Sequence, residues 1–280
     1  MRLNFNNPVL SKELKLRFRS SKSFNGILFY LIVMCIFVFG FIFVTMTVNG
    51  TMYFRPSESL VLFTLLSFIQ LGLVLFITPG LTAGVISTER EKQTLAILLT
   101  TSQSSFQIII GKLLSSIAFL LLLIVAGLPI YSLVFLFGGI SPLDFGLVFL
   151  YLFVTLLAIG SMGVMFSTII RRTIVSMIAT YGTMLVLSTV TGFLALMFAQ
   201  LMTLSTSAVP TSVPAHFLAS INPGVLMASL VSEDVGGLIK EFTKVDFPIW
   251  GTYLIFYLLV TVLSLFIAVK NLRVNMKRKK

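Results

Sequence analysis

Residues 87–99 read STEREKQTLAILL, and the first half of this stretch interrupts a long apolar region. Between Ser23 and Ile170 only eight residues are charged, and four of them are consecutive at positions 89–92. Long uncharged runs lie on both sides of the cluster, and each exceeds the roughly 18 residues that indicate a membrane helix. The stretch therefore predicts a polar connection between two membrane spans.

The composition of the whole chain supports this interpretation. Hydrophobic residues make up 57% of the sequence and charged residues only 10%, with a mean hydropathy of +1.06. An average soluble domain has about 25% charged residues, so the chain is predicted to be an integral membrane protein of the all-α class. The first apolar run is too long for the core of a signal peptide, and we expect it to be retained as a span.

Six segments are long and apolar enough to cross a bilayer, and together they predict one six-span helical bundle formed by a single transmembrane domain, residues 1–280. The predicted spans are residues 24–48, 59–86, 106–137, 145–170, 174–199 and 249–270. Residues 201–248 contain Pro210, Pro214 and the turn Asn222-Pro223-Gly224, so we expect re-entrant helices and loops on the outer side before the last span.

The distribution of basic residues predicts the orientation of the bundle. With both termini in the cytoplasm, 17 of the 20 Lys and Arg residues fall on the cytoplasmic side, and only Arg55, Lys240 and Lys244 fall outside. The net charge of +11 is thus explained by the topology of a multi-pass protein of the cell membrane. It does not indicate nucleic-acid binding, which requires a folded basic reader domain.

An amphipathic helix is predicted over residues 1–23, before the first span. Asn7-Pro8 is typical of a helix start, and apolar and basic side chains then fall on different faces. The apolar face contains Leu10, Leu14 and Phe18, and the basic face contains Lys12, Lys15, Arg19 and Lys22. The helix can be a simple anchor on the inner membrane surface or a contact for a cytosolic partner, and these residues leave both open.

The opening stretch predicts a short cytoplasmic helix between spans two and three. Thr88 and Glu91 have the spacing of a capping box, and Ser104 and Gln107 repeat it at the entry to the third span. The apolar face of the short helix would consist of Leu95, Ile97, Leu98 and Leu99. Such a helix can pack on its own bundle or dock on a partner, and its sequence alone does not decide between them.

Evidence for chemistry within this chain is sparse. Cys35 and His216 are the only residues of their types, which excludes an intrachain disulfide and gives no metal-ligand set or catalytic group. Gly111-Lys112 is not part of a phosphate-binding loop, because Phe106 replaces the first glycine and Leu113 the hydroxyl residue. We therefore predict that the chain is not an enzyme and binds no cofactor.

Hydroxyl residues recur at helical spacing in the fifth span, at Ser176, Thr180, Thr183 and Thr191. They can line a translocation path, although small and hydroxyl residues in membrane helices more often pack helices together. Gly80 and Gly84 form a G-x-x-x-G pattern beside Pro79, which favours close packing or a kink.

Residues 84–112, GVISTEREKQTLAILLTTSQSSFQIIIGK, closely resemble the signature of membrane subunits of type-two ATP-binding-cassette (ABC) exporters. The matching positions are Glu89, Arg90, Glu91, Thr94, Leu95, Leu98, Leu99, Gly111 and Lys112. Residues 7–21, NPVLSKELKLRFRSS, are also similar to the connecting helix of that family. The chain departs from the family at Gln93, where many members have glycine, and at Ala96, where an acid is common.

The resemblance implies a permease subunit whose segment between spans two and three is a coupling helix. Its ATPase-coupling residues would be Glu89, Arg90, Glu91, Thr94, Leu95 and Leu98, and its connecting-helix residues Lys12, Glu13, Lys15 and Arg19. ATP and Mg would be bound by a dimer of cytosolic ATPase subunits, and a second permease, identical or related, would complete the path. We expect export of a hydrophobic or amphipathic cargo; the alternatives are a self-sufficient secondary carrier and an intramembrane enzyme.

Overall fold

A computed structural model of the chain describes residues 13–15, 18, 21–50, 55–100, 103–138, 140–205 and 212–277. Within these ranges the protein is all-helical, with no strand, as the sequence predicts. The long helices are α2 (Ser21–Asn49), α3 (Pro56–Thr82), α6 (Ser105–Phe137), α7 (Pro142–Ile169) and α13 (Ile249–Lys277). The shorter elements are α4 (Ser87–Glu91), α5 (Leu95–Leu99), α8 (Thr173–Leu185), the π-helical turn η1 (Val186–Val190), α9 (Thr191–Ser205), α10 (Val213–Ser220), α11 (Pro223–Val231) and α12 (Glu233–Thr243).

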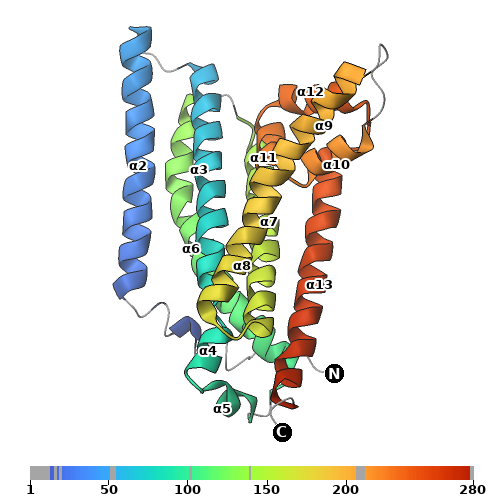
Figure 1. Cartoon of the computed structure of the whole chain (residues 1–280). Helices are drawn as coiled ribbons and strands as arrows, with labels where there is room; N and C mark the ends of the chain where they lie inside the picture. Colours follow the sequence, from blue (N-terminus) through green and yellow to red (C-terminus); the bar gives the residue numbers. More distant parts are fainter. Residues whose placement is uncertain are drawn as a thin grey trace.

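Six segments run lengthwise through the bundle, and these confirm the six predicted spans. They are α2, α3, α6, α7, the continuous series α8–η1–α9, and α13. Figure 1 places α4 and α5 at one end of the bundle, with α10 to α12 at the opposite end. We call these the α5 end and the α12 end. The helix α3 of the second span ends at Thr82, because residues 83–86 form a turn that leads into α4.

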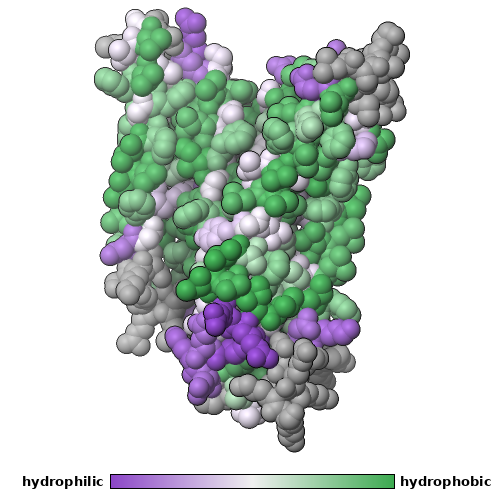
Figure 2. All heavy atoms as spheres, viewed as in Figure 1, coloured by the Kyte–Doolittle hydropathy of each residue, from purple (hydrophilic) through white to green (hydrophobic). Residues whose placement is uncertain are grey.

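The hydrophobic and hydrophilic residues on the surface are arranged as in a protein that spans a bilayer. Figure 2 shows a broad hydrophobic band between hydrophilic ends, and one of the hydrophilic areas covers the region of α4. Large apolar side chains such as Phe39, Ile178 and Phe266 are exposed within this band. Such exposure suits contact with lipid, because no water surrounds the middle of a spanning helix.

Local capping sets several helix starts, as the sequence predicts. Ser104 and Gln107 form a reciprocal capping box at the start of α6. The hydroxyl of Ser141 accepts a hydrogen bond from the backbone N–H of Asp144 at 3.1 Å, so Ser141 caps the start of α7. These side chains satisfy backbone N–H groups that have no partner within the helix.

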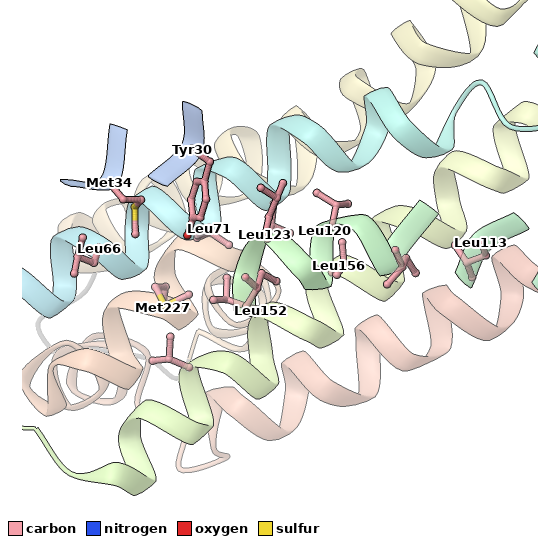
Figure 3. Packing of buried hydrophobic residues seen from close by; sticks show 14 of the residues in the cluster. Tyr30, Met34, Leu66, Leu71, Leu113, Leu120, Leu123, Leu152, Leu156 and Met227 are labelled. Carbon is pink, nitrogen blue, oxygen red and sulfur yellow. The ribbon is translucent and has the colours of Figure 1, made fainter. Parts of the chain in front are cut away.

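The main core lies where α3, α6 and α7 meet. Figure 3 shows Leu66 of α3, Leu120 of α6 and Leu156 of α7 among the buried side chains of this cluster. The helix α2 is attached at its side through Tyr30, whose hydroxyl donates to Oε1 of Gln70 at 2.5 Å. Interdigitated apolar side chains therefore hold the spans together. Buried hydrogen bonds between spans add to this packing, such as those of Tyr30 with Gln70 and of Thr155 with Tyr253.

The segment before the last span contains broken helices, in agreement with the prediction for residues 201–248. The helices α10 and α11 meet at an angle of 84°, and both lie at the α12 end (Figure 1). The side chain of Asn222 accepts bonds from the backbone N–H groups of Gly224 and Val225, so it caps α11 directly after the bend. The predicted turn at Asn222-Pro223-Gly224 is thus the corner between the two helices.

Candidate coupling site

The turn after α3 is held against the end of α7. The hydroxyl of Ser167 accepts hydrogen bonds from the backbone N–H groups of Ile86 and Ser87, at 2.8 and 2.9 Å. Nearby, a Cβ at Gly163 would lie only 2.1 Å from the Thr82 hydroxyl oxygen, so α7 and the end of α3 approach each other at a glycine. The start of α4 is therefore positioned by the fourth span.

Arg90 binds the C-terminal end of α7. Its Nη2 donates to the carbonyl of Thr168 at 2.9 Å, and its Nη1 donates to the carbonyl of Ile170 at 3.4 Å. The last carbonyls of a helix have no partner within the helix, and a cation there also interacts favourably with the helix dipole. Arg90 thus satisfies backbone carbonyls at the end of the fourth span.

Glu91 binds the N-terminal end of the next helix, α8. Its two carboxylate oxygens accept from the backbone N–H of Thr173 at 2.8 Å and from the Thr173 hydroxyl at 2.9 Å. This carboxylate lies in α4, beyond the end of the spanning helix α3, and the two bonds hold its pKa below the usual value. Two consecutive side chains of α4 therefore bind the C-terminal end of α7 and the N-terminal end of α8, which lie on either side of Arg171 and Arg172 in the sequence.

The predicted capping box between Thr88 and Glu91 is wrong. The N-cap position of α4 is Ile86, which has no side-chain oxygen to offer. The Glu91 carboxylate is bound to Thr173, and the Thr88 hydroxyl lies 3.3 Å from the Thr173 hydroxyl. Tertiary partners have replaced the local ones that the spacing suggests.

Glu89 belongs to a second group of charges, centred on Lys112. The Lys112 Nζ lies 2.7 Å from Oε1 of Glu13 and 3.2 Å from Oε1 of Glu89, and the lysine side chain is only 5% exposed. The other oxygens of the two carboxylates accept from hydroxyl groups: Ser115 donates to Glu13 at 2.5 Å, and Thr94 donates to Glu89. We call Lys112, Glu13 and Glu89 the lysine clasp.

The clasp connects three parts of the chain. Glu13 belongs to the segment before the first span, Glu89 to α4, and Lys112 to α6. Burial raises the pKa of Glu89, but bonds from Thr94 and Lys112 outweigh that effect, so the pKa lies below its usual value. A buried ammonium requires such compensation, because an isolated charge is costly to desolvate.

The predicted single short helix consists of two helices, so that expectation is also wrong. Between α4 and α5, Gln93 has φ = 60°, a left-handed conformation in which a helix cannot continue. The side chain of Leu95 is buried and Leu98 is half-buried against the main core, whereas Lys92, Gln93 and Ala96 are exposed. Leu95 and Leu98 thus pack on the chain's own bundle, and the exposed residues lie on the other side of α5. The side chain of Ile97, also predicted on the apolar face, lies outside the description.

The structure also describes part of the predicted connecting helix. Glu13 to Lys15 are helical, and Glu13 belongs to the lysine clasp. Lys12, Arg19 and the Asn7-Pro8 helix start lie outside the described residues. The sequence indicated Lys112 only as part of a Gly-Lys pair, and nothing in the pattern around Ser167 or Thr173 identified them as partners of α4.

The candidate path residues of the fifth span lie in the interior of the chain. Ser176, Thr180 and Thr191 are buried, and the hydroxyls of Thr180, Thr183 and Thr191 donate to carbonyls four residues earlier in their own helix. Gly80 of α3 and Gly84 of the turn after it face the same segment, with Tyr181 and Thr173 as neighbours. In the single chain these small and hydroxyl residues support helix packing.

His216 and Cys35 are the remaining residues that the sequence analysis considered for chemistry. His216 is buried in α10, and its Nδ1 lies 3.3 Å from the hydroxyl of Thr243 in α12. Cys35 is half-buried in α2 and carries no disulfide. Neither residue is part of the coupling site.

The fold and the charged contacts at the α5 end define a multi-pass helical membrane protein with a short helical connection fixed to several of its spans. A family model described as "ABC-2 family transporter protein" matches residues 8–273. The chain therefore belongs to this family and is a permease of an ABC transporter. A comparison with curated proteins found no match.

Proposed function

We propose that this permease is driven by a separate cytosolic ATPase that docks on the exposed side of α4 and α5. The single observation that carries the proposal is the pair of contacts made by Arg90 and Glu91 to the ends of α7 and α8. A force applied to α4 would reach two spanning helices through charge-assisted hydrogen bonds, which are stronger than neutral ones.

In this proposal the residues bonded to the spanning segments transmit movement, and the exposed residues without such bonds contact the partner. Glu89, Arg90 and Glu91 position α4, Thr94 orients Glu89, and Leu95 and Leu98 hold α5 on the bundle. Lys92, Gln93 and Ala96 lie on the exposed side. We assign the docking surface to these three residues together with the surrounding backbone.

The proposed cycle uses a dimer of ATPase subunits that holds ATP and Mg, with two permease chains, identical or related, forming the path. Closure of the ATPase dimer would move α4 and α5, and the lysine clasp would carry this movement to α6 and to the segment before α2. We propose export, with the α5 end and both termini in the cytoplasm of the cell. The basic residues near Arg90, Arg171 and Lys270 support this orientation.

The cargo in this proposal is hydrophobic or amphipathic. The exposed faces of the spanning helices are apolar, with residues such as Val186 and Leu259 on the surface. The hydroxyls of Thr180, Thr183 and Thr191 donate within their own segment, and Ser176 is buried, so these residues would meet cargo only after the fifth segment moves. A path between two permease chains agrees with this placement.

The test is gentle extraction of the chain from its native membrane, followed by identification of co-purified ATPase subunits and measurement of ATP hydrolysis. We expect Ala96→Trp to reduce co-purification, because it adds bulk on the exposed side of α5. Glu91→Ala should leave the ATPase bound but uncouple hydrolysis from cargo. Transport by the purified chain without any ATPase would support a secondary carrier and contradict the proposal.

A further inference from the structure

A cavity of about 670 Å³ lies at the α12 end, away from the coupling site. Its walls come from η1 and α9 of the fifth segment, from the bent pair α10–α11 and from α12. Binding pockets for small molecules have volumes of roughly 300–1,000 Å³, so this cavity is within their range.

The walls of the cavity are hydrocarbon. Side chains that line it include Phe193, Ala195, Leu196, Val225 and Ile239. A polar cargo or ordered water would need hydrogen-bonding partners here, and an internal water usually makes two to four such bonds. Such a ligand could bind only if the few polar groups at the edge of the cavity had free hydrogen-bonding capacity.

Three of the four polar residues that line the cavity, Asn222, Ser188 and Thr243, already have partners, and the fourth, Thr189, is exposed. The Nδ2 of Asn222 donates to the carbonyl of Ser188 at 2.5 Å and to the hydroxyl of Thr191 at 3.0 Å, while its Oδ1 caps α11. The hydroxyls of Ser188 and Thr243 donate to carbonyls in their own helices. The amide of Asn222 thus stabilises the π-helical turn and the corner of the bent pair, and has no bond left for a ligand.

The cavity is continuous with the hydrophobic surface of the bundle. Three of its lining residues, Phe193, Leu196 and Phe242, are 66%, 70% and 51% exposed. They place the opening on the side of the fifth segment where its apolar residues contact the bilayer. A ligand can therefore enter from the membrane without crossing a polar surface.

The helix α12 places the opening at a defined depth. Val235 and Ile239 of α12 line the cavity, whereas Asp234, Lys240 and Glu241 are exposed on its other side. An amphipathic helix of this kind lies in the plane of the membrane, at the level of the lipid headgroups. The cavity lies on the apolar side of that helix, where the hydrocarbon chains of a lipid begin.

We propose that the cavity binds one hydrocarbon chain of a membrane amphiphile, with the polar head of that molecule beside α12. Lipid chains are as apolar as the walls, so binding is driven by dispersion contacts that fill an otherwise poorly packed space. Because Ser188 and Thr189 of η1 line the cavity, an occupied cavity contacts the irregular turn of the fifth span. This inference does not depend on the proposed ATPase docking.

The experiment uses the full chain in phosphatidylcholine vesicles that contain a trace of phosphatidylcholine with a diazirine near the end of one acyl chain. After illumination, labelled peptides are identified by mass spectrometry, without nucleotide or ATPase. We expect residues 213–243 to be labelled several-fold more than the lipid-facing residues 255–266 of α13. Equal or lower labelling of residues 213–243 would overturn the proposal.

Two variants that fill the cavity make the test specific. Ala228→Phe on α11 and Val235→Phe on α12 each add bulk inside the cavity and should reduce its labelling about fivefold. Val262→Phe adds similar bulk on the lipid-facing side of α13 and should leave the labelling of the cavity unchanged. Unchanged labelling in both cavity-filling variants would contradict the assignment.

A second copy of the chain is the competing occupant. Phe193→Cys in a Cys35→Ala background places one thiol at the opening of the cavity. We expect no cross-link between two copies through this thiol. Cross-linked dimers together with an unlabelled cavity would show that the neighbouring chain covers it, and the lipid assignment would be wrong.

Discussion

The carboxylate of Glu91 binds both the backbone N–H and the hydroxyl of Thr173, at 2.8 and 2.9 Å, across 82 positions of sequence. A residue of the short helix α4 therefore caps the fifth spanning segment. Its neighbour Arg90 donates to backbone carbonyls at the end of the fourth segment. Both ends of the loop between the fourth and fifth segments are therefore bonded to α4.

Loss of this cap should loosen the start of α8. In Glu91→Ala the backbone N–H of Thr173 loses its acceptor and the first turn of α8 loses its cap, so we expect several-fold faster hydrogen exchange of the amides of residues 173–176. Glu241→Ala, which removes an exposed acid at the opposite end, should leave this exchange unchanged. Equal exchange in Glu91→Ala and the wild type would show that water replaces the carboxylate without loss.

The same cap should depend on pH. The pKa of Glu91 in the folded chain is below its ordinary value of 4.5, so the bond contributes stability above the unfolded pKa and loses it as the pH falls through the folded pKa. We expect the exchange of the Thr173 amide, corrected for intrinsic rates, to stay constant from pH 7 to about 5 and to rise at lower pH. The Glu91→Ala variant should show no such rise.

Removal of the cation from the lysine clasp should lower the stability of the fold more than removal of one of its acids. Lys112→Met leaves Glu13 and Glu89 close together and without their shared partner, which should cost roughly 2–3 kcal/mol. Thermal unfolding in detergent measures the difference. The double variant Glu13→Gln/Lys112→Met should recover part of the loss, because one of the two repelling charges is gone; no recovery would argue against direct coupling.

The close approach of α7 to α3 should require glycine at position 163. A methyl group there would lie 2.1 Å from the hydroxyl oxygen of Thr82, so Gly163→Ala must displace Thr82 or separate the helices, at about 1–3 kcal/mol. Gly146→Ala is the matched control in the same helix, because a Cβ there meets no atom within 4 Å. Unfolding midpoints that fall equally in both variants would disprove the steric argument.

The left-handed backbone at Gln93 should make this position favour glycine. Gln93 has φ = 60°, which costs a residue with a side chain roughly 1 kcal/mol, so Gln93→Gly should maintain or raise stability and Gln93→Val should lower it. Lys92→Gly is the control, because Lys92 has φ = −78° and gains nothing from glycine. Greater stability of Gln93→Val than of Gln93→Gly would contradict the prediction.

The membrane class, the six spans and the start of α6 could be predicted from the amino-acid sequence alone. Runs of apolar residues and a cap such as Ser104 with Gln107 act over a few neighbouring residues, so their effect can be read locally. Even the preference for glycine at position 93, noted from the family resemblance, has a local cause in the backbone conformation.

The partners of the charged residues 89–91 depend on the packing of the spans and could not be predicted from the sequence. The sequence places Thr88 and Glu91 at capping distance, but helix ends from residues 167–173 and the ammonium of Lys112 lie close enough to bind the cluster instead. Helix ends carry unpaired N–H and carbonyl groups and attract charged side chains, yet which helix end meets which side chain depends on how the spans pack. That packing brings together residues about 80 positions apart, and no local pattern records it.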